Sequence, residues 1–263
     1  MPYKLIALDV DGTLLNDDYK LTDATKDAVR AVSEAGALIV LCTGRSPLNT
    51  MPIMDQLGLE GVMISHNGGA TVNSRDRSII HEYAFTVRQA EPVISYCRNN
   101  NIHFDICPPM DMYVEKLTEE TRAMYGKYLM TPKLVSDVMA IDQGIVKMSI
   151  FGEREEIDKL EREYPVIGCP LSIIRSGDHF ADIMHPESTK GNALRELAGS
   201  LRIDREHIMA IGNYFNDVEM IEFAGLGIAM DNSPEAVKSS ADAVTASNNK
   251  DGVSAALREY CLV

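Results

Sequence analysis

The sequence predicts an α/β fold: a doubly wound, Rossmann-like parallel sheet with a separate α+β unit inserted into it. Two observations support this prediction. Near both ends of the chain, short apolar runs of strand length alternate with helical patterns, and the runs are apolar throughout, as in strands buried on both faces of a parallel sheet. In the middle of the chain, strand candidates follow one another in pairs with helices beside them, which is typical of an α+β unit.

The N-terminal part begins the predicted sheet. Residues 5–8 are continuously apolar and give way to acidic residues, so we expect the first buried strand there. A helix over residues 22–36 follows, with Thr22 as its N-cap and Gly36 at its C-terminal end. Two further strands are expected at residues 38–41 and 62–64.

The same alternation returns in the C-terminal part. Helices are expected at residues 190–198 and 217–224, and strands at residues 208–211 and 226–230. Ser233 and Pro234 then open one more helix, with serine as the N-cap and proline at the first helical position. Ligands of doubly wound sheets bind beyond the carboxyl ends of the strands, near the point where the strand order reverses. We therefore expect the functional site at that edge.

The middle of the chain has a different pattern. Helices are expected at residues 87–98, 118–129 and 153–164, and strands at residues 102–106, 146–151, 172–175 and 180–184. This change predicts a core domain made of residues 1–81 and 187–263, with a cap domain inserted at residues 82–186.

Composition limits the function classes. The net charge of −14 and the lack of a long run of Lys and Arg argue against a nucleic-acid partner. The apolar runs are far shorter than the roughly 20 residues that span a bilayer, and no secretory leader is recognisable, so we expect a cytoplasmic protein without a membrane partner. Five cysteines without a Cys-x-x-Cys pair predict free thiols. A small anionic substrate remains compatible with this charge, because a bound divalent cation can reverse the local field.

Two aspartates directly follow the first predicted strand. Asp9 and Asp11 stand two residues apart, with Gly12 and Thr13 after them. Two carboxylates held together at a strand end repel each other unless a cation or a shared proton offsets the charge. Magnesium binds one or two carboxylates together with a substrate phosphate. An isolated Asp-x-Asp-Gly is also typical of a solvated turn, so this segment needs support from elsewhere.

Three other segments supply that support. Thr43 and Gly44 follow the second predicted strand and offer a hydroxyl and backbone N–H groups to a phosphate. Lys190 opens a helix, where its ammonium group and the helix dipole both favour an anion. The segment 212–217 joins a strand to a helix and contains three side chains with amide or carboxylate oxygens: Asn213, Asn216 and Asp217. Taken singly, the segment with Thr43 and Gly44 is weak evidence, and a lone exposed lysine is usually solvated. The segment 212–217 is equally typical of a helix start that Asn216 caps.

Taken together and in this order, the segments resemble the haloacid dehalogenase superfamily, and within it the Cof-type, sugar-phosphatase-like enzymes with an α/β cap of class IIB. The resemblance covers nearly the full length of the chain. It rests on residues 9–15, 43–45, 67–68, 190–191 and 212–220.

The resemblance implies a magnesium-dependent phosphomonoester hydrolase that acts on a small phosphorylated metabolite through an aspartyl phosphate. It implies that Asp9 is the nucleophile and Asp11 the general acid and base, with Asp217 in the outer shell. The implied magnesium ligands are Asp9, the Asp11 main-chain carbonyl and Asn213, and the implied phosphate-binding residues are Val10, Thr43, Gly44, Lys190 and Asn216. The family usually has aspartate where this chain has Asn213, which removes one negative charge from the predicted metal site.

Two other functions stay open from the sequence. A phosphotransferase or phosphomutase would pass the phosphoryl group from the aspartate to a second hydroxyl instead of water. A regulatory protein would keep the phosphate pocket without turnover; Asn213 favours that alternative, whereas the presence of both Asp9 and Asp11 argues against it. Substrate identity and oligomeric state are not readable from the sequence.

Overall fold

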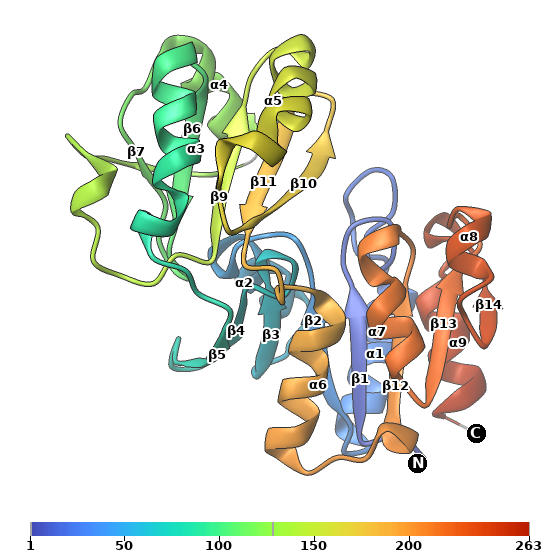
Figure 1. Cartoon of the computed structure of the whole chain (residues 1–263). Coiled ribbons are helices and arrows are strands. Elements are labelled where there is room, and N and C mark those ends of the chain that lie inside the picture. Colours follow the sequence, from blue (N-terminus) through green and yellow to red (C-terminus); the bar gives the residue numbers. More distant parts are fainter. Residues whose placement is uncertain (1, 128, 263) are drawn as a thin grey trace. The chain divides into compact units, whose positions relative to one another are not determined.

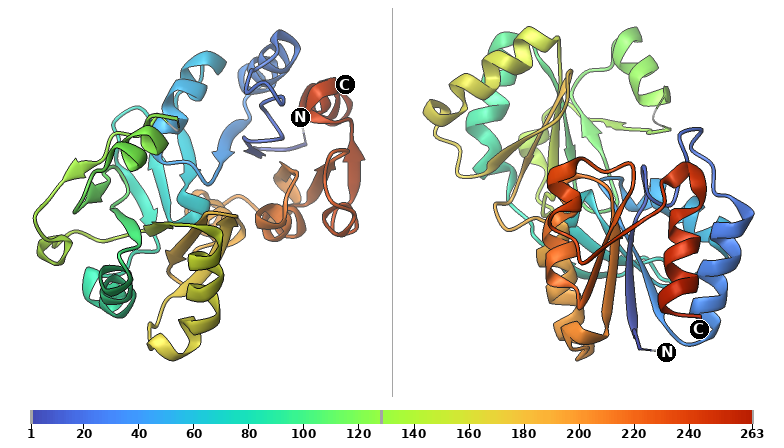
Figure 2. Two further views of the ribbon diagram at one scale, coloured as in Figure 1. Left: turned by 90° about the horizontal axis from the view of Figure 1, so that it is seen from above. Right: turned by 90° about the vertical axis from the view of Figure 1, so that its right-hand side faces the viewer.

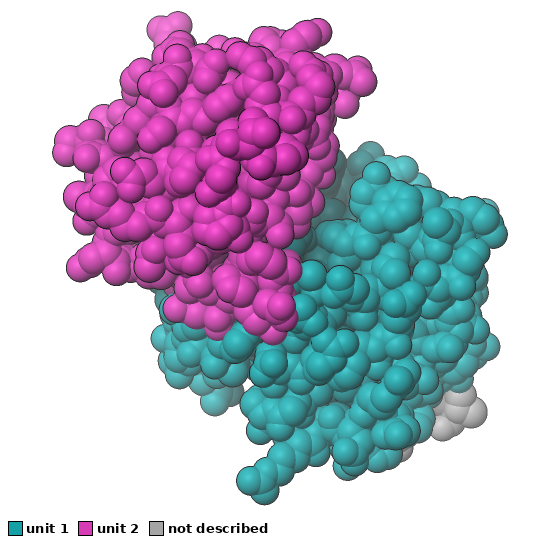
Figure 3. Space-filling view, viewed as in Figure 1, with its two compact units in different colours: residues 1–81, 189–263 teal, residues 82–188 magenta. Residues whose placement is uncertain are grey.

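The chain divides into two compact units. The computed structural model describes residues 2–127 and 129–262 (Figure 1). Unit 1 comprises Met1–His81 and Thr189–Val263, and unit 2 comprises Glu82–Ser188, as Figure 3 shows in two colours. Unit 1 is therefore built from two separate stretches of the chain, with unit 2 inserted between them.

A single mixed sheet forms the centre of unit 1. Its strands lie in the order β14-β13-β12-β1-β2-β3-β4-β5. Every neighbouring pair from β14 to β3 is parallel, and β4 runs antiparallel to β3. The strands are β1 (Leu5–Asp9), β2 (Leu38–Cys42), β3 (Val62–Ser65), β4 (Ala70–Asn73), β5 (Ile79–Glu82), β12 (Ile208–Gly212), β13 (Leu226–Met230) and β14 (Ala243–Thr245).

Helices cover both faces of this sheet (Figure 2). They are α1 (Asp23–Glu34), α2 (Pro47–Leu57), α6 (Lys190–Leu201), α7 (Val218–Phe223), α8 (Glu235–Lys238) and α9 (Gly252–Tyr260). Leu5 and Ala7 of β1 share one buried cluster with Leu194 and Leu197 of α6 and Met220 of α7. Because side chains alternate along a strand, Ile6 and Leu8, which are also buried, face the opposite side of the sheet. Strand β1 is thus apolar on both faces, as the sequence predicts.

The strand order reverses at β1, since β2 lies on one side of it and β12 on the other. The parallel register pairs Asp9 with Cys42 and Leu8 with Ile211. The residues that follow β1, β2 and β12 therefore emerge side by side at one edge of the sheet, where a doubly wound fold binds its ligand.

Unit 2 has its own sheet and its own core. The sheet order is β10-β11-β9-β6-β7-β8. Phe104, Ile106 and Met148 belong to the buried cluster that also contains Ile94 of α3 and Leu160 of α5. The elements of this unit are α3 (Val87–Asn100), β6 (His103–Cys107), β7 (Tyr113–Val114), α4 (Glu119–Lys127), β8 (Lys133–Leu134), β9 (Lys147–Phe151), α5 (Arg154–Ile167), β10 (Ser172–Gly177) and β11 (Phe180–Met184).

The fold class and every strand and helix named from the sequence are confirmed, with end points that differ by up to three residues. One end point is instructive: Pro234, not Ser233, is the N-cap of α8, so that helix begins one residue later than predicted. The predicted helix at 118–129 appears as α4, and Tyr128 in that range lies outside the described residues. Within the described part of the chain, no helix combines the length and apolar character needed to cross a membrane.

Candidate active site

A buried lysine lies between two buried carboxylates at the carboxyl edge of the unit 1 sheet. Lys190 Nζ is 2.7 Å from Asp9 Oδ1 and 2.6 Å from Asp217 Oδ1. Asp9 is the last residue of β1, Lys190 is the first of α6, and Asp217 ends the short 3-10 helix η4 (Phe215–Asp217). Segments that are distant in sequence thus share one charge cluster, and all three of these residues were predicted to belong to the site.

All three side chains of the cluster are buried, and with both carboxylates ionised the cluster has one net negative charge. Burial and the Asp217 carboxylate raise the pKa of Asp9, although the Lys190 ammonium and the Thr13 hydroxyl oppose that shift. Burial disfavours the charged form of Lys190, but the Asp217 and Asp9 carboxylates together outweigh it and raise the pKa of Lys190. Since the lysine is shared, a further cation beside Asp9 would stabilise its ionised carboxylate.

Asp217 also organises the loop that follows β12. Its Oδ2 accepts hydrogen bonds from the backbone N–H groups of Asn213 and Tyr214, at 2.9 and 3.0 Å. A side chain on Gly212 would overlap the Asp217 carboxylate, because a Cβ there would lie 2.5 Å from Asp217 Cβ. Asp217 therefore fixes the backbone that carries Asn213.

Asn213 lies where the predicted metal ligands converge. One terminal atom of its amide is 3.0 Å from Asp9 Oδ2, 3.1 Å from the Asp11 main-chain oxygen and 3.3 Å from Thr13 Oγ1. If that atom is nitrogen, it donates to these oxygens. If it is oxygen, it accepts from the Thr13 hydroxyl at 3.3 Å, and a cation or a proton is needed between it and the Asp9 and Asp11 oxygens, which are acceptors. The amide lies against Gly12, whose positive φ of 81° and missing side chain give it room.

The donor set fits magnesium. Octahedral magnesium holds oxygens at about 2.1 Å, which puts neighbouring ligands about 3.0 Å apart. With the amide oxygen of Asn213 facing Asp9 and Asp11, the separations of 3.0 and 3.1 Å are close to this value. The set comprises one carboxylate, one main-chain carbonyl and one amide. Among the described residues no three His, Cys, Asp or Glu side chains form a group that could hold a metal ion.

Asp11 points to a different partner. Arg45 Nε and Nη2 donate to Asp11 Oδ2 and Oδ1, at 2.8 and 2.6 Å, and so form a bidentate ion pair. Hydrogen bonding to Asp11, against the opposing effect of burial, raises the pKa of Arg45. The Asp11 side chain is 44% exposed. Its main-chain oxygen therefore lies in the Asn213 cluster while its carboxylate faces solvent and Arg45.

The remaining predicted residues lie at the same edge. Thr43 is buried, and its Oγ1 accepts from the Arg45 backbone N–H at 3.1 Å. Val10 directly follows Asp9 and is fully buried. Asn216 is exposed, and its Nδ2 donates to Asn67 Oδ1 at 3.0 Å. Gly44 lies against the same Asn67 side chain, since a Cβ on Gly44 would be 3.0 Å from Asn67 Oδ1.

Arg45 and Asn67 contact predicted site residues, but no role was assigned to either of them from the sequence. Their position in segments that carry the family resemblance was the only indication that they belong to the site. Nothing in the local pattern predicts that Arg45 pairs with Asp11, 34 residues earlier, or that Asn67 pairs with Asn216, 149 residues later.

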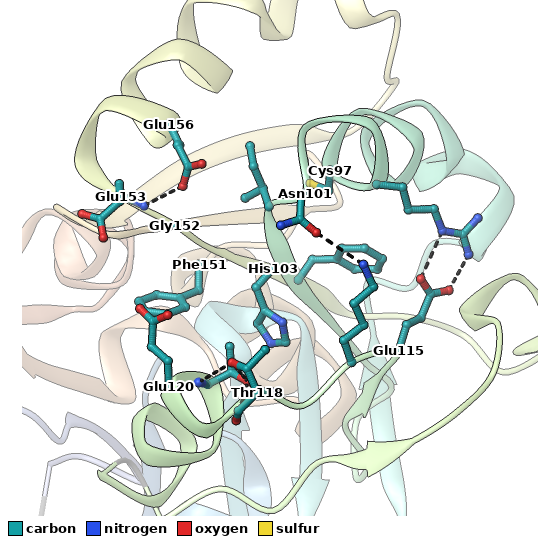
Figure 4. A pocket seen from close by; sticks show the side chains of 15 residues that line it. Cys97, Asn101, His103, Glu115, Thr118, Glu120, Phe151, Gly152, Glu153 and Glu156 are labelled. Carbon is teal, nitrogen blue, oxygen red and sulfur yellow. Dashed lines mark hydrogen bonds and ion pairs between the residues drawn. The ribbon is translucent and has the colours of Figure 1, made fainter.

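A separate cavity of about 240 Å³ lies in unit 2, between the C-terminal end of α3 and the N-terminal ends of α4 and α5. Figure 4 shows its lining, with Phe151 and His103 on one side and carboxylates such as Glu120, Glu153 and Glu156 around it. Every lining residue belongs to unit 2. None of the predicted site residues is among them.

Comparison with known proteins places the chain in a family. The family model of haloacid dehalogenase-like hydrolases matches residues 6–257. The chain is 32% identical over 267 residues to "Putative phosphatase YxeH" of Bacillus subtilis (strain 168), covering 99% of each protein. It is 27% identical to "5-amino-6-(5-phospho-D-ribitylamino)uracil phosphatase YwtE" of the same organism, covering 95% of each.

A solved structure described as the subclass IIB sugar phosphatase BT4131 of this superfamily has the same fold. The TM-score is 0.82 at 24% sequence identity, over 99% of this chain and 100% of that one. Since the family model spans almost the whole chain and the named phosphatases align along nearly their full length, the chain belongs to the haloacid dehalogenase-like hydrolase family and is a phosphatase.

Proposed function

We propose that this protein is a magnesium-dependent phosphomonoester hydrolase that acts on a small phosphorylated metabolite through an aspartyl phosphate on Asp9. The observation that carries the proposal is the position of Asp9. It is a buried carboxylate at the end of the central strand, held by Lys190 at 2.7 Å and placed 3.0 Å from the Asn213 amide.

In the first step, Asp9 attacks the phosphorus and the bond to the leaving oxygen breaks. Asp11 donates a proton to that oxygen as general acid. The pair with Arg45 must open first, because a carboxylate held by two guanidinium N–H groups has no proton to give. In the second step, Asp11 removes a proton from water, which attacks the acyl phosphate and releases Asp9 with inorganic phosphate.

The other residues stabilise the transferred group. Lys190, the Thr43 hydroxyl and the Asn216 amide are positive or hydrogen-bond donors, as are the backbone N–H groups of Val10 and Gly44, and they suit the equatorial oxygens of a phosphoryl group in transfer. Magnesium, held by Asp9, the Asp11 carbonyl and Asn213, would supply charge neutralisation when bound. Asp217 keeps Lys190 charged and the Asn213 loop in place.

Unit 2 acts, in this proposal, as the cap that selects the substrate, while unit 1 supplies the chemistry. The relative named for a ribitylaminouracil phosphate supports a phosphorylated metabolite of similar size as the substrate. Such metabolites occur in the cytoplasm, which is where we place the protein.

The test is hydrolysis of a panel of phosphomonoesters by the purified protein, with and without Mg²⁺. Asp9→Asn should lower turnover roughly a thousandfold or more, because a carboxamide cannot form the acyl phosphate. The matched control is Asp55→Asn, which replaces an exposed aspartate on α2. Its turnover should equal that of the wild type. A folded Asp9→Asn protein that kept a tenth of the activity would refute the covalent mechanism. Transfer to an added alcohol or sugar in preference to water would instead favour a phosphotransferase.

A further inference from the structure

A strained turn follows β3 at the active-site edge. His66 and Asn67 are consecutive residues with φ of 50° and 53°, and Gly68 follows with φ of 96°. Left-handed backbone is uncommon for residues other than glycine and is best tolerated by asparagine and aspartate. Such conformations persist only where the surroundings enforce them, and they cluster at functional sites.

Backbone hydrogen bonds enforce the turn. The His66 N–H donates to the Arg45 carbonyl at 2.9 Å, and the Asn67 N–H donates to the Thr43 carbonyl at 3.0 Å. On the other side, Gly68 lies so close to the start of α6 that a Cβ would be 2.1 Å from the Thr189 carbonyl oxygen. The turn is thus clamped between the Thr43 segment and the helix that begins with Lys190.

This clamp brings the Asn67 side chain to the Asn216 side chain. Asn67 Oδ1 accepts from Asn216 Nδ2 at 3.0 Å, and the Asn67 amide lies against Gly44. Asn67 is partly buried, whereas Asn216 is exposed on η4 between the exposed Phe215 and the buried Asp217. An exposed asparagine can adopt several rotamers. The hydrogen bond to Asn67 therefore restricts the Asn216 side chain to the rotamers that make this bond.

We infer that Asn67 is a positioning residue for the phosphoryl group and acts through Asn216. The amide nitrogen of Asn216 carries two N–H bonds. Asn67 accepts one of them, which fixes the nitrogen end of the amide toward the site and leaves the other N–H for a phosphate oxygen. The inference rests on the proposed function, because it takes Asn216 as a phosphate ligand.

A purely structural role would tie two loops together without affecting ligand affinity. The two roles differ in one measurable respect. If Asn67 acts through Asn216, removing Asn67 must matter only while Asn216 is present. A double-mutant cycle measures this dependence.

The probe is inorganic phosphate, and its affinity is measured by calorimetry in the presence of Mg²⁺ on four proteins: wild type, Asn67→Gly, Asn216→Ala and the double variant. Glycine keeps the left-handed backbone and removes the amide. Each single variant should bind phosphate about five- to tenfold more weakly, the effect of one hydrogen bond. The double variant should be within roughly twofold of Asn216→Ala.

Asn101→Gly is the matched control. Asn101 also has left-handed backbone, with φ of 54° and ψ of 33°, but it caps α3 in unit 2. Asn101→Gly should leave the phosphate affinity unchanged. Its melting temperature shows how much an Asn-to-Gly replacement at a left-handed position changes stability without affecting the site.

The inference would be overturned if Asn67→Gly weakened phosphate binding by the same factor with and without Asn216, if it had no effect on binding, or if the wild-type protein bound no phosphate. Failure of the proposed function has a different signature: wild-type protein that binds phosphate but hydrolyses no phosphomonoester. Since phosphate binding needs no turnover, the two failures are separable.

Discussion

The three charged residues at the centre of the site are buried together. Lys190, Asp9 and Asp217 are each less than a tenth exposed, and one ammonium group serves two carboxylates. Burying ions is costly, and the arrangement is stable only while the charges compensate one another. The sequence predicted the identity of these residues, because carboxylates and a lysine at strand and helix ends are typical of a phosphate site. It did not predict that the lysine would bridge both carboxylates, which depends on how β1, α6 and η4 meet.

The bridging role of Lys190 predicts a stability change with a distinctive rescue. Lys190→Met removes the cation and leaves two buried carboxylates together, so we expect a loss of about 3–5 kcal/mol in the free energy of unfolding. Adding Asp217→Asn should recover part of that loss, because one uncompensated charge disappears while the carbonyl oxygen can still accept from the Asn213 and Tyr214 N–H groups. Urea unfolding of the three proteins measures this. A double variant less stable than Lys190→Met alone would contradict the bridging role.

Asn213 predicts a metal requirement that one substitution can change. A carboxylate in its place would give magnesium a full charge instead of a dipole, so Asn213→Asp should lower the Mg²⁺ concentration for half-maximal activity by roughly 10-fold. In the absence of metal, the same change adds a carboxylate 3.0 Å from Asp9 Oδ2 and should lower the melting temperature.

Titrating Mg²⁺ at saturating substrate gives the first quantity, and thermal unfolding with and without Mg²⁺ gives the second. Position 213 would not be a metal ligand if Asn213→Asp left both the Mg²⁺ requirement and the Mg²⁺-induced rise in melting temperature unchanged.

Helices and strands with a clear periodic pattern of apolar residues were predicted from the sequence. The elements that were missed lack such a pattern, for reasons that the structure identifies. Helix α2 contains Pro52 in its interior and lacks a clear apolar face in its sequence, whereas α3 contains Pro92 but keeps such a face and was predicted. Strands β7 and β8 have only two residues each, too few to show alternation. Strand β5 is mostly exposed, so it lacks the apolar run that marked its neighbours. The turn at 66–68 depends on hydrogen bonds to a distant loop, which no local pattern encodes.

The sheet of unit 2 carries buried polar groups on one face. Asp105 on β6 is 4% exposed; it accepts from Tyr125 OH at 3.0 Å and from Cys107 Sγ at 3.2 Å. It pairs across the sheet with Ser149, which donates to Asp182 at 2.7 Å. Burial raises the pKa of Asp105 to about 6, although Lys147, Cys107 and Tyr125 lower it. The ionised form of Asp105 is therefore disfavoured by folding.

This raised pKa predicts a pH-dependent effect of Asp105→Asn. The folded protein holds the Asp105 proton more tightly than the unfolded chain does, so the stabilising contribution of protonated Asp105 is lost as the pH rises from the ordinary carboxyl value of 3.8 through about 6. An asparagine has no such loss. Relative to wild type, the variant should therefore gain stability as the pH rises from 3.8 to about 6, and the difference should level off above that pH.

The measurement is urea unfolding of both proteins across that pH range. Comparison with the variant is essential, because burial lowers the pKa of the nearby His103 to about 4 and gives the wild type an opposite pH dependence in the same range. The difference removes the part of the His103 contribution that is independent of Asp105 and keeps the part transmitted through Tyr125, which contacts both side chains. A difference in stability that did not change with pH would show that Asp105 does not titrate as proposed.

For the whole molecule, the sequence predicted the architecture because each level of pattern agreed. The apolar runs predicted the parallel sheet, and segments with predicted site residues follow β1, β2 and β12. The change of pattern in the middle of the chain indicated the inserted unit. Substrate identity was not predictable, because no local sequence pattern marks the side chains that would bind the leaving group. Each unit has its own sheet and its own buried cluster, which allows the contributions of the two units to be separated experimentally.

We predict that unit 2 sets selectivity and that unit 1 sets chemistry. Every residue assigned a role in catalysis, magnesium binding or phosphate binding lies in unit 1. A core-only protein, in which a short flexible linker replaces residues 82–188, should therefore still hydrolyse a small generic phosphate ester in the presence of Mg²⁺. It should lose most of its preference for the best metabolite, because the groups that recognise the leaving group are gone.

The preference is measured as the ratio of kcat/KM for that metabolite to kcat/KM for the generic ester, in the core-only and complete proteins. The core-only protein carrying Asp9→Asn serves as the control for contaminating phosphatases. Retention of the full ratio by the core-only protein would show that selectivity resides in unit 1.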